Sequence, residues 1–262
     1  MLRNSSRLFP PLAAPGAAAS PRAMHLPQTK QSAVLLKRYK RFLADVRLAG
    51  GQTLTVHCPN SGSMRGCSTP GSPVVISRSD NPARKYPWTL EMVQEDGVWI
   101  GVHTGRTNTL VREGLENGVI DDFGRILTIT PEVVVSARSR LDFLIETDRG
   151  RVYVEVKNCS LAQDRTALFP DAVTVRGTKH IAELTRLSEA GFGTAVLFCV
   201  QRGDADRCRP AAEIDPVYAR AVASAAARGV QFLAYQAEVR FEAITITRKI
   251  PFQLERSGAD HA

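Results

Sequence analysis

The sequence predicts a mixed α/β protein, α+β overall, in which a small β-barrel precedes a domain with helices packed on a mixed sheet. From about residue 32 to 103, short runs of alternating apolar and polar residues are separated by Gly and Pro, with no long helical stretch. From 104 to 254, segments of helical period alternate with strand-like runs. The chain of 262 residues is long enough for two such units.

Both ends of the chain are predicted to lie outside the fold. Residues 1–31 begin with "MLRNSSRLFPPLAAPGAAASPRAMH", which is rich in Pro, Ala and Ser and contains no acid. The segment lacks the continuous apolar stretch of a secretory signal. We therefore expect a disordered extension, with Met24 as a candidate translation start, and a disordered tail over residues 255–262.

The first unit is predicted to be built from hairpins. The runs "RYKRFLADVRL" and "QTLTVHC" alternate apolar and polar residues and are separated by "AGGQ", which predicts two strands and a turn. Further strands are predicted at "PVVISRS" and at "TLEMVQEDGVWIGVHT", the latter divided by a turn at Asp96 and Gly97.

The second unit is predicted to follow the order α-β-β-β-α-β-α-β. "TNTLVREGLENG" predicts a helix with Asn108 as its cap and Gly118 as its stop. Strands are predicted at "RILTITPEVVVS", "SRLDFLIE" and "RVYVEVKN". "RGTKHIAELTRLSEAGFG" is an amphipathic helix, followed by a buried strand "TAVLFCVQ", a helix that starts after Asp215 and a last strand "VQFLAYQAEV".

Charge and cysteine content narrow the functional classes. The formal net charge of +8 favours an anionic partner such as nucleic acid or a membrane surface, or serves solubility alone. Five cysteines without a CxxC pair fit neither a disulfide framework nor a zinc ribbon, which predicts a reducing, cytoplasmic setting. His57 and Cys58 lack a second ligand pair, so no zinc site is expected. No apolar run reaches the roughly 18 residues that a membrane span requires.

Acidic and basic residues interrupt the predicted hairpin "RSRLDFLIETDRGRVYVEVKN". A turn around Asp148 and Gly150 brings Asp142 and Glu155 toward each other on adjacent strands. Lys157 follows two residues after Glu155 and therefore points to the same face. Two carboxylates beside a cation suit Mg²⁺, which would activate water and polarise a phosphate, with Lys157 orienting the water or offsetting developing charge. The alternative is a surface salt bridge between Glu155 and Lys157.

The chain also resembles known proteins. The D-x(n)-E-x-K pattern after a helix that bears an acid resembles the core of the PD-(D/E)xK nuclease superfamily. From "LLKRYKRFLADV" to "KIPFQL" the chain is similar to the sugar fermentation stimulation protein A family, through "HCPNSGSMRGC", "RKYPWTLE", "SRLDFLIE", "VEVKN", "FPDAV" and "RGTKHIAEL". Ser61 stands where the family has Thr, and Val175 where relatives usually carry a charged residue.

The resemblance implies both a fold and site residues. It implies an OB-like barrel joined to a nuclease-like domain in a DNA-binding protein linked to regulation of sugar (maltose) metabolism. It places Asp142, Glu155 and Lys157 at metal and catalytic positions. Glu113, on the first helix of the second unit, stands where a supporting metal ligand is often found, and Glu132 is a second-tier candidate. Alternatively, Glu113 is an exposed helix charge.

Basic residues are predicted to contact nucleic acid at three places. Cations at a helix N-terminus, as in "VRGTKHIAEL", oppose the helix dipole and are better explained if an anion binds there. The loop "HCPNSGSMRGC" can present N–H groups, or be a self-bonded turn. "KRYKR" and "ARKYPW" combine cations with aromatics that either stack on bases or belong to the core. The predicted contacts are Lys37, Arg38, Lys40, Arg41, Asn60, Arg65, Arg84, Lys85, Arg176, Lys179 and His180.

Two functions follow from these patterns. The first is a cytoplasmic DNA-binding regulator linked to sugar metabolism, which contacts mainly phosphates and therefore binds with strong salt dependence. No helix-turn-helix is evident, which argues against an operator-specific repressor. The alternative is a nuclease or phosphodiesterase dependent on Mg²⁺ or Mn²⁺ and acting on DNA or RNA. Strand preference and oligomeric state are left open.

Overall fold

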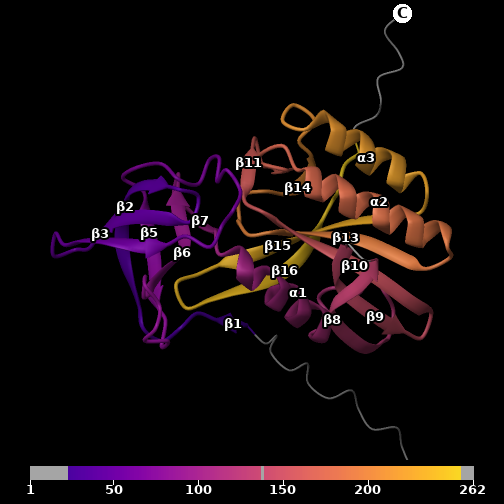
Figure 1. Ribbon diagram of the computed structural model, residues 1–262, viewed down its shortest axis with the longest axis horizontal. Helices are drawn as coiled ribbons and strands as arrows, with labels where there is room; N and C mark the ends of the chain where they lie inside the picture. Colours follow the sequence, from indigo (N-terminus) through magenta and orange to yellow (C-terminus); the bar gives the residue numbers. More distant parts are fainter. Residues whose placement is uncertain (1–22, 137–138, 255–262) are drawn as a thin grey trace, which may run out of the picture.

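The computed structural model describes residues 23–136 and 139–254. It has a mixed α+β architecture with a β-barrel at one end and a sheet domain at the other (Figure 1), which confirms the predicted fold class. Within the described residues no helix is long and apolar enough to cross a membrane.

The barrel is a six-stranded sheet that closes on itself. Its strands are β2 (Lys30–Tyr39), β3 (Leu43–Arg47), β4 (Thr53–His57), β5 (Pro73–Arg78), β6 (Trp88–Glu95) and β7 (Val98–Gly101). Their order is β4-β3-β2-β5-β6-β7, and a further pairing between β4 and β6, through His57 and Thr89, closes the barrel. Alternate side chains fill a core of its own that includes Leu35, Val56 and Leu90.

One predicted strand of the barrel is in fact two. The run "RYKRFLADVRL" turns back on itself at Lys40 and Arg41, whose φ angles are 49° and 61°. These left-handed conformations are uncommon outside Gly, Asn and Asp, so two basic residues gave no turn signal. The result is a tight β2–β3 hairpin that the alternating pattern conceals.

The prediction that residues up to 31 lie outside the fold is wrong for those that the structure describes. Met24–His25 form β1, which pairs with β16 (Ala243–Ile250) at the edge of the second sheet, and β2 begins at Lys30. Met24 and Leu26 are buried in the core of that domain, which pays for ordering this segment. The remaining predicted disorder, at 1–22 and 255–262, lies outside the described residues.

The sheet domain is a seven-stranded mixed sheet. Besides β1 and β16 it contains β8 (Ile126–Ser136), β9 (Ser139–Thr147), β10 (Gly150–Cys159), β13 (Gly193–Val200) and β15 (Gln231–Val239). Their order is β1-β16-β15-β13-β10-β9-β8, with β10, β13 and β15 parallel and the other pairs antiparallel. A small second sheet joins β11 (Leu161–Gln163), β12 (Thr166–Phe169) and β14 (Arg207–Pro210).

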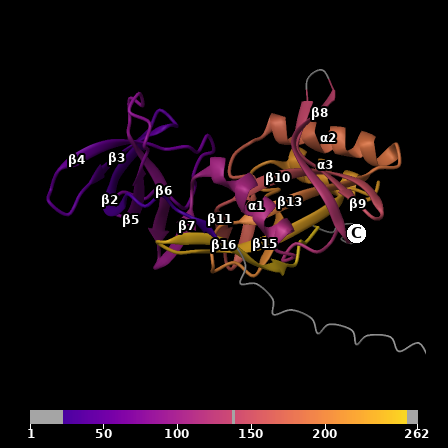
Figure 2. The ribbon, with the colours of Figure 1, turned by 90° about the horizontal axis from the view of Figure 1, so that it is seen from below.

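Helices cover both faces of the large sheet (Figures 1 and 2). The short η1 (Thr104–Arg106) leads into α1 (Thr107–Glu116), whose buried side chains join one core. The helices α2 (Val175–Glu189) and α3 (Pro216–Ala226) join the core of the opposite face. All three helices were predicted, and Asp215 caps α3 by accepting a 2.9 Å hydrogen bond from the Tyr218 N–H.

Candidate metal centre and nucleic-acid cleft

Asp142 and Glu155 lie where two paired strands separate. The antiparallel pairing of β9 and β10 runs from Gly150 opposite Thr147 to Val154 opposite Phe143, where it ends. Asp142 and Glu155 are the next residues on the two strands. Beyond this fork the Val156 N–H donates to Asp142 Oδ2 at 2.7 Å, while β10 continues its pairing with β13. The fork therefore brings the two carboxylates together, as the hairpin pattern indicates.

Glu155 is buried and its two oxygens have different surroundings. Oε1 accepts a 2.6 Å hydrogen bond from Lys157 Nζ and also contacts His180 Nδ1 from α2. Oε2 is buried without a hydrogen-bond partner. The side chains of Glu155 and Lys157 are only 4% and 12% exposed, so their ion pair is not the surface salt bridge of the alternative interpretation. An unpaired buried carboxylate oxygen is costly unless something binds it.

The pKa values of the two carboxylates are shifted in opposite directions. Burial, followed by the charge of Glu155, raises the pKa of Asp142 above its ordinary value. Burial alone would also raise the pKa of Glu155, but the hydrogen bond with His180 and the charge of Lys157 outweigh it and hold that pKa below its ordinary value. Neighbouring carboxylates whose pKa values are driven apart are typical of functional sites.

The first helix contributes an amide to this centre rather than an acid. Asn108 does not cap α1, whose N-cap is Arg106; it donates from Nδ2 to Asp142 Oδ1 at 2.8 Å. Glu113, the predicted third ligand, is not among the residues that line the cleft. Among the residues that the structure describes, no group of three or more His, Cys, Asp or Glu is placed to hold a metal. Glu132 borders the cleft, but it is exposed and paired with Arg140 at 2.8 Å.

A buried amide network that the sequence did not reveal supports the other side of the site. Gln201, fully buried at the end of β13, contacts Asn158 Oδ1 through Nε2 at 2.5 Å. Thr107 Oγ1 lies 3.4 Å from the same oxygen. With its oxygen engaged, Asn158 has its amide N–H groups left for the cleft that it borders. The only signal in the sequence is a Gln that ends an otherwise apolar strand.

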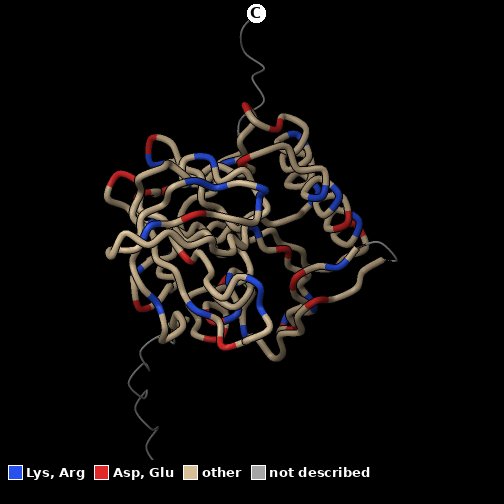
Figure 3. Tube along the Cα trace, turned by 60° about the vertical axis from the view of Figure 1, so that its left-hand side comes forward, with Lys and Arg blue, Asp and Glu red and all other residues tan. Residues whose placement is uncertain are grey.

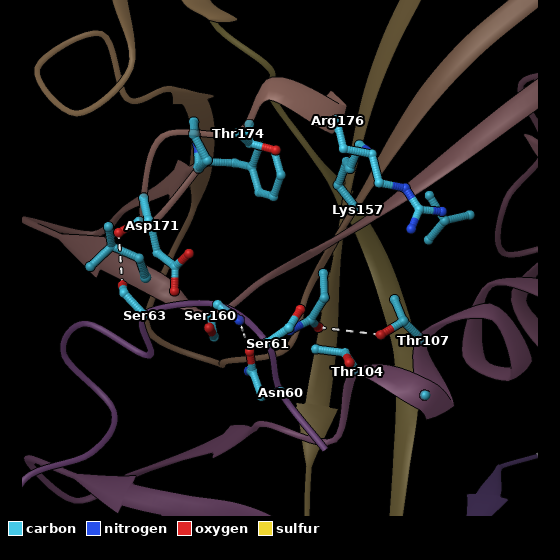
Figure 4. A pocket seen from close by; sticks show the side chains of 18 of the residues that line it. Asn60, Ser61, Ser63, Thr104, Thr107, Lys157, Ser160, Asp171, Thr174 and Arg176 are labelled. Carbon is cyan, nitrogen blue, oxygen red and sulfur yellow. Dashed lines mark hydrogen bonds between the residues drawn. The ribbon is translucent and has the colours of Figure 1, made fainter. Parts of the chain in front are cut away.

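The site opens into a cleft of about 820 Å³ between the barrel and the sheet domain. In Figure 4 the barrel loop with Asn60, Ser61 and Ser63 forms one wall, and Lys157 and Arg176 face it from the other. We define residues 59–64 as the barrel loop. Its conformation is fixed from within, because Asn60 is buried and its side chain binds the Val102 carbonyl and the Gly62 N–H.

Three predicted nucleic-acid contacts have structural roles instead. Arg38 lines the cleft, but its guanidinium donates to the backbone carbonyls of Arg41, Asn60, Gly62 and Ser63 and so shapes the barrel loop. Asn60 is 4% exposed and bonded within the protein. His180 is 6% exposed and holds Glu155. Although Arg38 and Asn60 border the cleft, the hydrogen bonds of all three side chains serve the protein's own backbone or Glu155.

The other predicted contacts lie in different places. Arg41 and Arg176 line the cleft, and Lys179 lines a second hollow between α2 and the β8–β9 hairpin. The rest do not border the cleft: Lys37, Lys40, Arg65, Arg84 and Lys85. Of these, Arg84 is engaged with His57 and Thr89, and Lys37 with Asp45. Figure 3 shows Lys and Arg on both the barrel and the helices rather than gathered on one element.

Comparisons with known proteins match both parts of the chain. A family model described as the sugar fermentation stimulation protein RE domain matches residues 105–243, and one described as the SfsA N-terminal OB domain matches residues 36–102. The chain is 49% identical over 238 residues to a sugar fermentation stimulation protein homolog of Desulfotalea psychrophila, covering 91% of this chain and 98% of the relative. It is 52% identical over 217 residues to that of Pelobacter propionicus, covering 83% and 94%.

A solved structure shares the fold. The Pyrococcus furiosus SfsA structure, described as a complex with Ca²⁺, superposes with a TM-score of 0.81 at 23% identity, over 88% of this chain and 98% of the other. The similarity extends across both the barrel and the sheet domain, which is consistent with one shared two-part architecture.

Proposed function

This chain belongs to the sugar fermentation stimulation protein family, and from that premise and the geometry of the cleft we propose that it is a divalent-metal-dependent phosphodiesterase acting on nucleic acid. The observation that carries the proposal is the partnerless buried Oε2 of Glu155, next to Asp142 and Lys157 at the floor of an open cleft. The arrangement Asp142, Glu155, Lys157 also has the order of the PD-(D/E)xK pattern that the sequence resembles.

The residues present fit a hard divalent cation. Glu155 Oε2 has no other partner, and each oxygen of Asp142 accepts a single hydrogen bond in the structure. Two carboxylates plus water and phosphate oxygens form the usual protein environment of Mg²⁺. The Ca²⁺ in the description of the Pyrococcus furiosus relative supports a divalent metal here too, since Ca²⁺ also takes oxygen ligands. Asp142 and Glu155 would hold the metal, without the predicted help of Glu113.

The side chains around the carboxylates have separate tasks in this proposal. A divalent metal, when bound, supplies activation of water and neutralisation of charge on a phosphate. Lys157 uses one donor on Glu155 and has two left for a phosphate oxygen or the attacking water. His180 and Asn108 act as positioning residues, because their side chains hold Glu155 and Asp142; of the two, Asn108 also borders the cleft.

Nucleic acid is the partner that best matches the surroundings of this centre. Two carboxylates repel a polyanion unless a cation neutralises them, so their presence in a basic protein is explained by a metal and a phosphate together. Arg41 and Arg176 add positive charge at the border of the same cleft. The sequence shows no helix-turn-helix pattern, which favours contacts to the backbone rather than to a defined sequence.

The second candidate is a DNA-binding regulator, linked to sugar metabolism as the family description has it, on a nuclease frame that does not cleave. One observation favours it: Lys157 and His180 already engage Glu155 Oε1, so the centre is partly neutralised without metal. In that case binding would depend on phosphates and salt but not on a metal.

Cleavage assays separate the two candidates. Purified protein is incubated with labelled single- and double-stranded DNA and RNA in Mg²⁺, Mn²⁺ or EDTA, beside Asp142→Asn and Lys157→Met. The phosphodiesterase requires metal-dependent products that both variants lose. A matched control is Asp148→Asn, an exposed carboxylate in the turn between β9 and β10, which should retain full activity. If the protein binds nucleic acid in a salt-sensitive way but forms no cleavage products with either Mg²⁺ or Mn²⁺, the proposal is overturned in favour of the regulator.

A further inference from the structure

The barrel loop is fastened at both ends to residues outside the barrel. At its start, the Pro59 carbonyl accepts hydrogen bonds from Thr104 Oγ1 at 2.7 Å and from the Thr104 N–H at 3.3 Å. At its end, Ser63 Oγ donates to the Asp171 carbonyl and the Met64 N–H to Asp171 Oδ2, both at 2.8 Å. Asp171 lies between β12 and α2, so these contacts tie the loop to the sheet domain, as Figure 4 shows for Ser63.

The same loop is stiff between its two fastenings. The Arg38 guanidinium, which also borders the cleft, donates to three of the loop's carbonyls, and Asn60 bonds across the loop to Gly62. Gly62 passes so close to Asp171 that a Cβ at this position would lie 2.9 Å from its carboxylate. The barrel loop is therefore a rigid wall of the cleft, and moving it outward to widen the cleft would break several hydrogen bonds together.

The size of the cleft limits what reaches the acids. About 820 Å³ falls in the range of about 300–1,000 Å³ that encloses one small-molecule ligand, which is enough for a short stretch of one strand. Two paired strands need more room, because the two phosphate backbones of a duplex lie on either side of its grooves, about 12 Å apart across the major groove and about 6 Å across the minor groove. A fixed wall cannot move aside to accommodate the second strand.

The lining of the cleft favours the sugar-phosphate backbone over the bases. Hydroxyl and amide groups line it, among them Ser61, Thr104 and Asn158. Phe169 is the one aromatic residue among the described lining residues, and its ring packs at 5.5 Å and 5.4 Å from Phe198 and Tyr218 in the core. Stacking on aromatic rings is therefore not the main source of binding, in contrast to many single-strand binding grooves.

A route for the rest of the strand leads along α2. Arg176 borders both the cleft and the second hollow, a space of about 1180 Å³ between α2 and the β8–β9 hairpin that Lys179 also lines. Both side chains are exposed and lie in the first turns of the helix. Cations at these positions can follow the phosphates of a strand as it leaves the acids.

We infer that the substrate enters this cleft as a single strand, and that the barrel loop pinned to Asp171 excludes paired nucleic acid. The inference rests on the proposed function for the identity of the ligand, and it adds the strandedness and its structural cause. Recognition through the backbone implies little preference for base sequence.

Binding measured without cleavage tests the inference independently of activity. Fluorescence anisotropy in Ca²⁺ compares labelled single-stranded DNA and RNA 20-mers with a blunt DNA duplex of the same sequence. We expect at least one single strand to bind about tenfold more tightly than the duplex, or about 1.4 kcal/mol. Equal or tighter binding of the duplex overturns the inference, even if cleavage by the protein confirms the phosphodiesterase. Absence of cleavage, with the single-strand preference retained, contradicts only the proposed function.

Loosening the loop tests the cause. The double variant Ser63→Ala, Asp171→Ala removes both side chains that join the loop to the sheet domain, and it should reduce the preference for single strands at least about threefold. Asp148→Ala removes an equal charge from an exposed turn and should leave the ratio unchanged. Thermal unfolding verifies that each variant is folded, and Ser63→Ala alone replaces the double variant if it is not. An unchanged ratio in a folded loop variant overturns the pinned loop as the barrier.

Discussion

Replacing Arg106 by Met should destabilise the protein by about 3–5 kcal/mol, because it strips a buried carboxylate of its counter-charge. Glu91, in the barrel strand β6, is fully buried. Its two oxygens receive Nε and Nη2 of Arg106 at 2.7 Å each, and Ser77 Oγ at 2.5 Å. Arg106 is 22% exposed, so solvent compensates little for the lost contacts.

The loss can be measured by differential scanning calorimetry and by urea unfolding. For a protein of this size a loss of 1 kcal/mol lowers Tm by roughly 2–4 °C, which predicts a decrease of roughly 6–20 °C. The double variant Glu91→Leu, Arg106→Met should recover part of it, since replacing both partners removes the unpaired charge. Calcium affinity should also fall in Arg106→Met, because the ion pair with Glu91 fixes the start of the helix that carries Asn108.

Arg112→Met is the matched control on the same helix. Its partner Glu116 is 2.8 Å away, but the side chains are 48% and 39% exposed, and such pairs contribute about 0.3–0.5 kcal/mol. If Arg106→Met costs less than about 1 kcal/mol, or no more than the control, the buried pair does not join the barrel to α1 as reasoned.

Three further predictions concern other buried groups. Burial raises the pKa of the Cys67 and Cys199 thiols to about 12 and all five cysteines are buried, so Ellman's reagent at pH 8 should react with none until guanidinium unfolds the protein. His180→Ala should weaken calcium binding by about 10–100-fold in titration calorimetry, since it removes a positioning contact to Glu155, and unchanged affinity would contradict that role. Asp215→Ala should lower the free energy of unfolding in urea by about 1–3 kcal/mol. The reason is that this side chain, only 2% exposed, caps α3 and also accepts a hydrogen bond from the Thr174 N–H just before α2. A loss below about 0.5 kcal/mol would refute the dual role.

The sequence could predict those elements whose own residues specify them. The helix periods of α1, α2 and α3 and the turns at Gly97 and Gly150 depend on nearby residues, and the structure confirms them. Strands that depend on partners distant in the sequence were not predicted. The sequence does not predict β16, in which only "ITIT" alternates apolar and polar residues, and the short strands of the second sheet exist only because β12 pairs with both β11 and β14.

The same distinction applies to the site. Asp142, Glu155 and Lys157 belong to one hairpin, so spacing along the chain was enough to place them together. Asn108 and Gln201 come from segments whose approach to the fork depends on the tertiary fold. The surface role predicted for His180 and Arg38 was incomplete, since a sequence does not tell a basic side chain that bonds a carboxylate or backbone carbonyls from one that faces solvent.

The position of β1 has a mechanical consequence. Because the chain starts its described course in the large sheet, leaves it to build the barrel and returns at η1, the barrel is attached at two places rather than hanging from one linker (Figures 1 and 2). A unit with two attachments can pivot only about the line that joins them, which restricts its torsion. Truncation before Lys30 would cut one attachment and at the same time bare the backbone edge of β16, inviting sheet-to-sheet aggregation.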